Sequence, residues 1–194
     1  MSALRDPEAV GDPELWSHVL EGDGRSFGLL FDRHRDRVHS HIRRLVDDAG
    51  EAEDLTAAAF LELWRRRASA RIVDGSLIPW LLVTAGNVTS NANRARRRYR
   101  RFLSALPAAV SEPDHADGVA ARLDLEPRVR ELLAAIADLP VADQRLIVLT
   151  ALEGLTLLQA SEATGLSYGA AKTRLSRART RLGGILTSEF GAIS

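Results

Sequence analysis

The sequence predicts an all-α protein made of two small helical domains joined by a flexible linker. Apolar residues recur at three- and four-residue steps along most of the chain, as they do on one face of a helix, and no repeat of strands is visible. A segment rich in Ala, Pro, Asp, Ser and Gly interrupts this pattern. We therefore expect one domain over residues 1–103, a linker over residues 104–126 and a second domain over residues 127–194.

Three helices are expected in the first domain. Apolar spacing predicts the first over about residues 26–45. Asp48, with Glu51 three residues later, resembles a capping pair that opens the second helix over about residues 49–67. The third begins near Ser76, carries an apolar first half and then turns polar and strongly basic.

Positive charge is segregated, although the chain as a whole is neutral. Lys+Arg number 26 and Asp+Glu also number 26, yet six of the eight residues from 94 to 101 are arginine. A second basic group follows near the C-terminus, at Lys172, Arg174, Arg177, Arg179 and Arg181. Basic patches of this kind are typical of proteins that contact phosphates, so we expect a nucleic-acid partner.

The second domain contains a pattern typical of a helix-turn-helix. After an amphipathic helix near residues 129–136, a second helix over about 141–153 is followed by Gly154, a plausible left-handed cap. Residues 156–182 then read as helix, turn and helix, with Gly165 at the turn, where a positive φ is needed.

The last helix of this motif, about residues 167–182, is expected to lie on DNA. Ala171, Leu175, Ala178 and Leu182 share one apolar face, while the opposite face is cationic and hydroxylic. A helix with two such faces fits the major groove, where arginines bond guanine edges and hydroxyls reach bases or phosphates. The alternative interpretation is that this is a solvated amphipathic helix of the kind found in any small bundle. The expected DNA contacts of this helix are Ser167, Tyr168, Lys172, Thr173, Arg174, Ser176, Arg177 and Arg179.

Several classes of function are excluded or disfavoured by the sequence. Without cysteine there is no disulfide, thiolate metal site or cysteine nucleophile. No catalytic or phosphate-cradling motif occurs, so we expect neither an enzyme nor a cofactor. No signal peptide and no membrane span are visible, so no membrane insertion and a cytoplasmic location are expected. A metal cluster is disfavoured because no outlying ligand supports its members, which would be His34, His39, His41, Asp32 and Asp36.

Three stretches in order resemble the extracytoplasmic-function (ECF) sigma factors, which keep only sigma regions 2 and 4 on a flexible linker. Residues 52–64 look like the family's polymerase-binding helix, and residues 80–94 like its promoter-melting helix. Leu139-Pro140 together with residues 165–179 is close to the signature of region 4. Substitutions of the family's usual residues stand at Ala57, Gly86, Asn91 and Gln159.

The resemblance implies a dissociable subunit of RNA polymerase that directs promoter-specific initiation. The acidic helix, with Glu51, Asp54 and Glu62, would bind RNA polymerase core. The second domain would read the minus-thirty-five element of promoter DNA, and the loop at residues 68–76 would help hold a flipped minus-ten base. An anti-sigma protein is an expected partner. The minus-ten element would be read and its phosphates neutralised by Asn87, Asn91, Arg94, Arg97 and Arg98.

Two alternative functions account for less of the sequence. A stand-alone helix-turn-helix regulator would leave the acidic helix and the basic third helix unexplained. A sigma-like interaction protein would require that neither basic face binds DNA.

Overall fold

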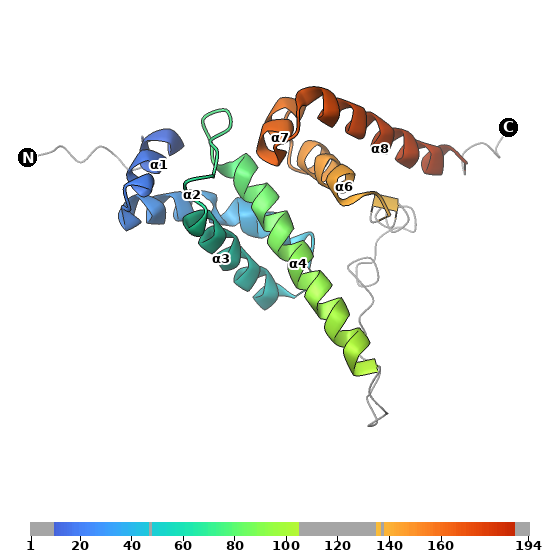
Figure 1. Ribbon diagram of the computed structural model, residues 1–194, viewed down its shortest axis with the longest axis horizontal. Coiled ribbons are helices and arrows are strands. Elements are labelled where there is room, and N and C mark those ends of the chain that lie inside the picture. The colour runs from blue at the N-terminus through green and yellow to red at the C-terminus, as the bar shows by residue number, and fades with distance from the viewer. Residues whose placement is uncertain (1–9, 47, 105–134, 137, 189–194) are drawn as a thin grey trace, which may run out of the picture.

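The regular secondary structure of the described residues is helical. This computed structural model describes residues 10–46, 48–104, 135–136 and 138–188 (Figure 1). Among them the sole strand-like pairing is an isolated antiparallel bridge between Val73 and Ser76. The expected linker at residues 104–126 lies outside the described residues except for Ser104, which ends the last helix of the first domain, and most of the helix expected at residues 129–136 lies outside them as well. The all-α prediction is confirmed.

Four helices form an N-terminal bundle. The last three match the three helices that the sequence predicts, and Asp48 accepts a hydrogen bond from the backbone N–H of Glu51, as expected for an N-cap. Asp23 caps the preceding helix in the same way, through the N–H groups of Arg25 and Ser26. The first helix is not among the sequence predictions. The four helices are α1 (Asp12–Leu20), α2 (Gly24–Arg43), α3 (Ala49–Arg65) and α4 (Ile78–Ser104).

The bundle is held by the apolar faces of these helices. Leu30, Ile42, Leu63 and Leu81 are fully buried where α2, α3 and α4 meet. An aromatic cluster closes one end, because the rings of Phe27, Phe31, Phe60 and Trp64 contact one another edge to face at centroid distances of 4.7–6.5 Å. Burial of this apolar surface is what fixes the direction in which the polar faces of α3 and α4 point.

Three helices and one wider turn form a C-terminal group. The helix expected up to residue 153 is α-helical only to Ile147 and then continues as a π-helical turn, which ends before Gly154 at φ +68°. The left-handed conformation of Gly154 is as predicted, and the π turn is not. The elements are α6 (Val141–Ile147), the π turn η2 (Val148–Leu152), α7 (Leu157–Thr164) and α8 (Tyr168–Ser188).

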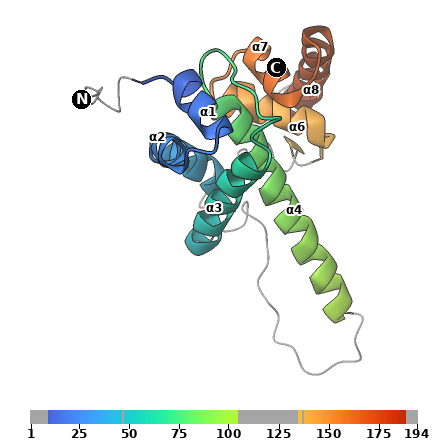
Figure 2. The same cartoon turned by 60° about the vertical axis from the view of Figure 1, so that its left-hand side comes forward.

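The C-terminal group lies against the N-terminal bundle. Helix α4 contacts both α7 and η2, and the two views agree that α7 lies beside the start of α4 (Figures 1 and 2). The second half of α4 extends away from the other helices. Within the described residues, no helix is both long and apolar enough to cross a bilayer.

Candidate nucleic-acid interface

Local hydrogen bonds set the geometry of the helix-turn-helix. The hydroxyl of Thr156 accepts from the N–H of Gln159, whose side chain accepts in turn from the N–H of Thr156, so α7 begins with a complete capping box. Gly165 ends α7 at φ +72°, in the left-handed region that the sequence predicts for this turn. The hydroxyl of Ser167 then accepts from the N–H of Ala170 and opens α8.

Helix α8 buries one face and exposes the other, as predicted. Ala171, Leu175, Ala178 and Leu182 are all buried against the rest of the C-terminal group. The opposite face carries hydroxyl and cationic groups and is open to solvent. Its exposed members include most of the DNA contacts expected from the sequence: Ser167, Tyr168, Lys172, Thr173, Ser176, Arg177 and Arg179.

Arg174 differs from its neighbours on α8. It is half-buried, and its guanidinium lies 3.1 Å from the carboxylate of Asp143 on α6. Part of its charge is therefore neutralised inside the C-terminal group. This pair also ties α8 to α6, so Arg174 contributes to the packing of the motif as well as to its positive potential.

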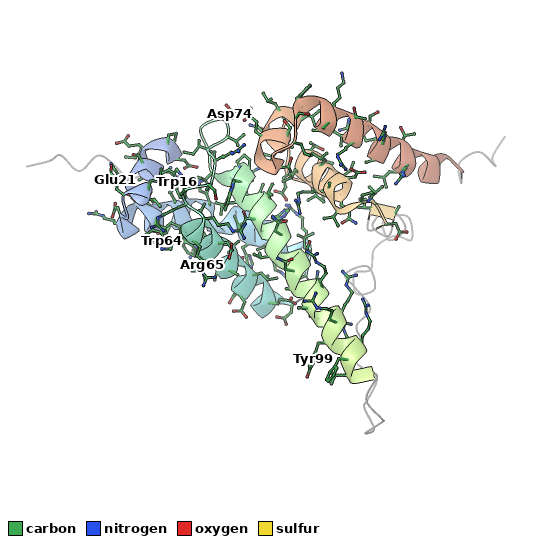
Figure 3. The ribbon with its side chains drawn as sticks, viewed as in Figure 1. Trp16, Glu21, Trp64, Arg65, Asp74 and Tyr99 are labelled. Atoms are coloured by element: carbon green, nitrogen blue, oxygen red, sulfur yellow. The ribbon has the colours of Figure 1, made fainter. Side chains whose placement is uncertain are left out.

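The second half of α4 is a second basic surface. Its arginines are exposed, and Arg94 donates to the side-chain oxygen of Asn91 one turn earlier at 2.7 Å. Arg97 and Arg98 are exposed as well, so their charges face solvent where a phosphate backbone can approach. Tyr99 also lies on this part of the helix and projects outward (Figure 3); its exposed fraction is 62%.

A hollow of about 310 Å³ lies between α3 and α4, at the base of this surface. Trp80, Thr84, Asn87 and Asn91 line it from α4, and Glu62 lines it from α3. Its volume reaches the lower end of the range found for small-molecule sites, and its walls combine an aromatic ring with amides and a hydroxyl. The sequence predicted Asn87 and Asn91 as binding residues, and Ser69, which also lines the hollow, belongs to the loop at residues 68–76 that was expected to help hold a flipped base.

The loop before α4 is a tight hairpin with two residues at its tip. Asp74 and Gly75 have φ values of +51° and +74°, and the Val73–Ser76 bridge closes the turn behind them. Positive φ at both central residues is the type I′ pattern that Asp-Gly favours. The tip carries Asp74 toward the C-terminal group (Figure 3), where its carboxylate accepts from Gln159 at 2.9 Å.

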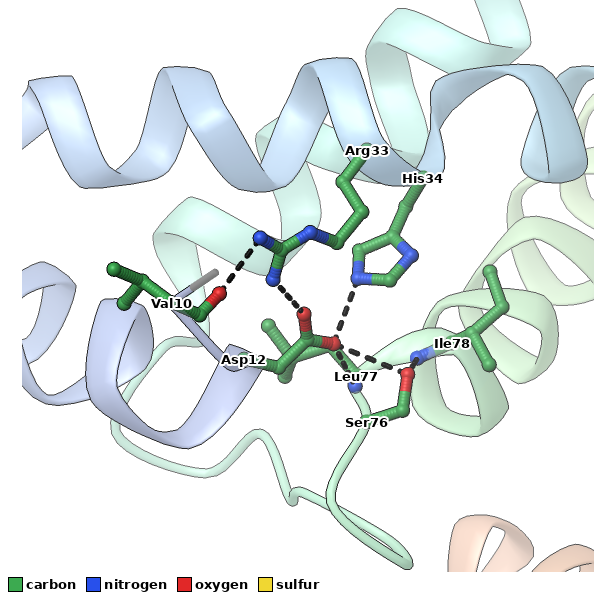
Figure 4. A network of polar contacts seen from close by, with 7 residues as sticks. All are labelled: Val10, Asp12, Arg33, His34, Ser76, Leu77 and Ile78. Atoms are coloured by element: carbon green, nitrogen blue, oxygen red, sulfur yellow. Dashed lines mark hydrogen bonds and ion pairs between the residues drawn. The ribbon is translucent and has the colours of Figure 1, made fainter. Parts of the chain in front are cut away.

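A buried carboxylate that sequence reasoning missed anchors the other end of this loop. Asp12 is 4% exposed and accepts from Arg33 at 2.8 Å, His34 at 2.7 Å, the Ser76 hydroxyl at 3.1 Å and the N–H of Leu77 at 2.8 Å (Figure 4). Burial alone would raise the pKa of Asp12, but these hydrogen bonds outweigh burial and hold its pKa well below the ordinary range. The network joins α1, α2 and the start of α4.

Two of the three histidines singled out in the sequence, His34 and His41, pair with carboxylates. His34 bonds Asp12, and His41 donates to Glu153 at 2.8 Å across the boundary between the bundle and the C-terminal group. Burial lowers the pKa of His41, although Glu153 partly offsets that effect. In the part of the chain that the structure describes, no group of three or more histidine and acidic side chains is arranged to hold a metal ion.

The acidic residues expected to bind a partner sit in different surroundings on α3. Glu51 pairs with Arg96 of α4, and Glu62 accepts from Arg66 at 2.8 Å one turn later. Asp54 is exposed. Two of these three carboxylates are therefore already engaged by arginines of the same bundle.

The chain is similar in sequence to known sigma factors. The model for sigma-70 region 2 matches residues 30–99, and that for sigma-70 region 4 matches residues 129–182. Similar chains include the ECF RNA polymerase sigma factor SigK of Mycobacterium sp. strain KMS, 31% identical over 83% of each chain. The RNA polymerase sigma factor CarQ of Myxococcus xanthus is 33% identical over 84% of this chain and 90% of its own.

Solved structures share the fold. CnrH, in complex with the cytosolic domain of CnrY, has a TM-score of 0.57 and 24% identity, covering 90% of this chain and 96% of that chain. The sigma factor RpoE in complex with the anti-sigma factor NepR, from Bartonella quintana, has a TM-score of 0.52 and 22% identity, covering 84% and 98%.

Proposed function

Because the chain belongs to the ECF RNA polymerase sigma factors and directs promoter-specific transcription initiation, we propose that two separate surfaces divide promoter recognition. The observation that carries the proposal is the exposure of a basic, hydroxyl-bearing face on α8 together with a second basic face on α4. Each of these faces lies within the segment that matches one sigma region.

The α8 surface would read the minus-thirty-five element. The apolar face of α8 is buried within the C-terminal group, so the helix can present only its polar face to a DNA groove. We assign base-edge contacts to Lys172, Thr173, Ser176 and Arg177, which are all exposed. Arg179, and Arg174 once released from Asp143, would contact phosphates.

The α4 surface would bind the melted minus-ten strand. Asn87 and Asn91 border the hollow beside Trp80, where an unstacked base would find a ring and amide groups. Arg94, Arg97 and Arg98 continue along the exposed helix and would neutralise the backbone. The Asp74 loop, anchored by Asp12, would border this site.

Helix α3 would bind the polymerase. Asp54 is exposed and is the acid best placed for an intermolecular pair. Glu51 and Glu62 would bind basic groups of the core enzyme, either in place of their present arginine partners or together with them. The polymerase would supply the chemistry of RNA synthesis, so this chain would need no catalytic residue and would act in the cytoplasm.

Residues 104–126 would act as the tether that lets both surfaces engage one promoter. We also propose regulation by an anti-sigma protein. Support for this comes from the two solved structures of similar fold, since that of RpoE contains the anti-sigma factor NepR and that of CnrH contains a domain of CnrY.

Run-off transcription with purified core polymerase tests the proposal. With a library of promoter sequences, we expect initiation only when the protein is added. The single variants Arg177→Ala and Arg97→Ala, both at exposed positions, should each reduce initiation without lowering the unfolding temperature. A stand-alone regulator would instead bind duplex DNA and leave transcription by core polymerase unchanged. That result would contradict the assignment of both surfaces.

A further inference from the structure

A carboxylate from the C-terminal group is buried against helix α2 of the N-terminal bundle. Glu153 directly follows the π turn and is 8% exposed. Its carboxylate accepts from His41 at 2.8 Å and from Arg44, and its backbone oxygen accepts from Arg37 at 2.8 Å. Burial of a carboxylate without hydrogen-bond donors costs free energy. The donors on α2, Arg37, His41 and Arg44, offset that cost for Glu153.

Two further polar contacts join the same halves of the protein. Arg145 of α6 donates to the side-chain oxygen of Asn87 at 2.5 Å, and Gln159 of α7 donates to Asp74 at 2.9 Å. Asn87 and the Asp74 loop are groups that the proposed function assigns to the minus-ten element. In this arrangement they are therefore occupied by the C-terminal group.

Polar pairs make up only part of the contact, because buried apolar side chains of both halves also belong to one continuous cluster. Between α2, α4 and α6 the packing leaves an open pocket of about 80 Å³, bordered by Leu45, Gly86 and Val141. Imperfect packing weakens an interface, and water can resolvate the charged groups when the two halves part.

The two surfaces are assigned to promoter elements whose names place them about 25 base pairs apart, which is about 85 Å of duplex at 3.4 Å per base pair. Helix α7 lies against α4 and its preceding loop, so this arrangement holds the helix-turn-helix beside the bundle that carries the α4 surface (Figure 2). Separation of the two halves would let the surfaces move apart along the duplex.

We propose that Glu153 is an intramolecular latch, which docks the C-terminal group on Arg37, His41 and Arg44 and covers the minus-ten-reading groups until the two halves separate. The covering role rests on the proposed function. The latch itself is a statement about the free protein and is testable without a promoter.

The distance between the halves of the free protein tests the latch. Because the native chain has no cysteine, Leu20→Cys on α1 and Thr180→Cys on α8 give two exposed positions for spin labels. We expect a narrow distance distribution for the otherwise native chain. Glu153→Gln keeps the shape but removes the charge, and it should shift the opening equilibrium by about 10- to 100-fold, which broadens and lengthens the distribution.

A matched control and a second opening variant keep the test independent of misfolding. Glu162→Gln makes the same change at an exposed position of α7 and should leave the distances unchanged. Gln159→Glu retains a capping-box residue but sets its charge against Asp74, so it should open the protein while the helix-turn-helix stays folded. Adding Asp74→Asn to that variant should close the protein again.

Binding of single-stranded DNA tests the covering role. With a randomised pool of fluorescent 12-mers and unlabelled full-length protein, Glu153→Gln should bind several-fold more tightly than either the native chain or Glu162→Gln. Unchanged distances in Glu153→Gln and Gln159→Glu would overturn the latch whatever the transcription assay shows. Opening without a gain in DNA binding would overturn the covering role. Failure of run-off transcription would count against the proposed function alone, because the distances still decide the latch.

Discussion

Replacement of Asp12 by asparagine isolates the charge of the buried network. The side chain keeps its shape, but one oxygen becomes an amide NH₂. If the remaining oxygen faces His34, Ser76 and Leu77, the NH₂ points at the guanidinium of Arg33, donor against donor (Figure 4). The flipped amide sets its NH₂ against the three other donors instead. Neither orientation satisfies the site.

The size of the effect follows from the bonds that are lost. A hydrogen bond to a charged group contributes about 1.5–3 kcal/mol, so with the donor–donor contact we expect Asp12→Asn to lose about 2–4 kcal/mol. For a chain of 194 residues this corresponds to a fall of about 4–16 °C in Tm. The loss is large enough to separate from the change of less than 0.5 kcal/mol expected at ordinary surface sites.

The pH dependence gives a sharper test. Because the folded-state pKa of Asp12 is depressed, its stabilisation is fully present above the unfolded pKa of about 3.9 and is lost as the pH falls toward the folded value. At pH 3 the native advantage over Asp12→Asn should shrink by about 1 kcal/mol, since protonation of the unfolded carboxyl then stabilises the unfolded state. Urea unfolding followed by circular dichroism at pH 6 and pH 3 measures both values. Equal stability at pH 6, or a gap that does not narrow at pH 3, would refute an ionised Asp12 held by these donors.

Three further outcomes are expected. Gly165→Ala should destabilise the protein by about 1–2 kcal/mol in thermal unfolding, because alanine is strained at φ +72°; no change would argue against the left-handed turn. Thr156→Ala should lose about 1 kcal/mol by the same measurement, because the capping box is broken, whereas Thr180→Ala at an exposed position should lose less. Burial lowers the pKa of His41, so its contribution to the closed form is present above about pH 6.5 and is lost as the pH falls below that value. Label distances should therefore lengthen on acidification, and a variant His41→Gln should show a weaker dependence. The charged groups around this ring are Glu153, Arg44 and, in the pocket that His41 also lines, Arg145 of α6.

Local chemistry explains what the sequence could predict. The Asp48 cap, the left-handed Gly165 and the buried face of α8 each depend on residues within one or two turns of one another, and all three appear as expected. Helix α1 was missed, although the spacing of Leu15, Trp16 and Val19, all buried, is a helical signal in the sequence.

Long-range contacts explain what it could not predict. Glu153 meets Arg37 across 116 positions of sequence, and nothing near Glu153 marks it as a residue to be buried. The π turn that precedes it is the segment Val148–Leu152, whose largely apolar sequence is equally compatible with an ordinary α-helix. The expected polar groups were found in the right helices, but which of them are engaged, as Arg174 is by Asp143, depends on packing between elements.

The free end of α4 has a consequence for how this protein responds to salt. Arginines follow Arg94 at spacings of three, four and seven positions, at Arg97, Arg98 and Arg101. Their charges therefore repel one another across adjacent turns, in a part of the helix that gains little stability from packing. A polyanion laid along this face would turn that repulsion into attraction. Helical order beyond Asn93 should then be coupled to the occupancy of the strand, and amide hydrogen exchange in this segment would slow when DNA binds and quicken again as added salt displaces it.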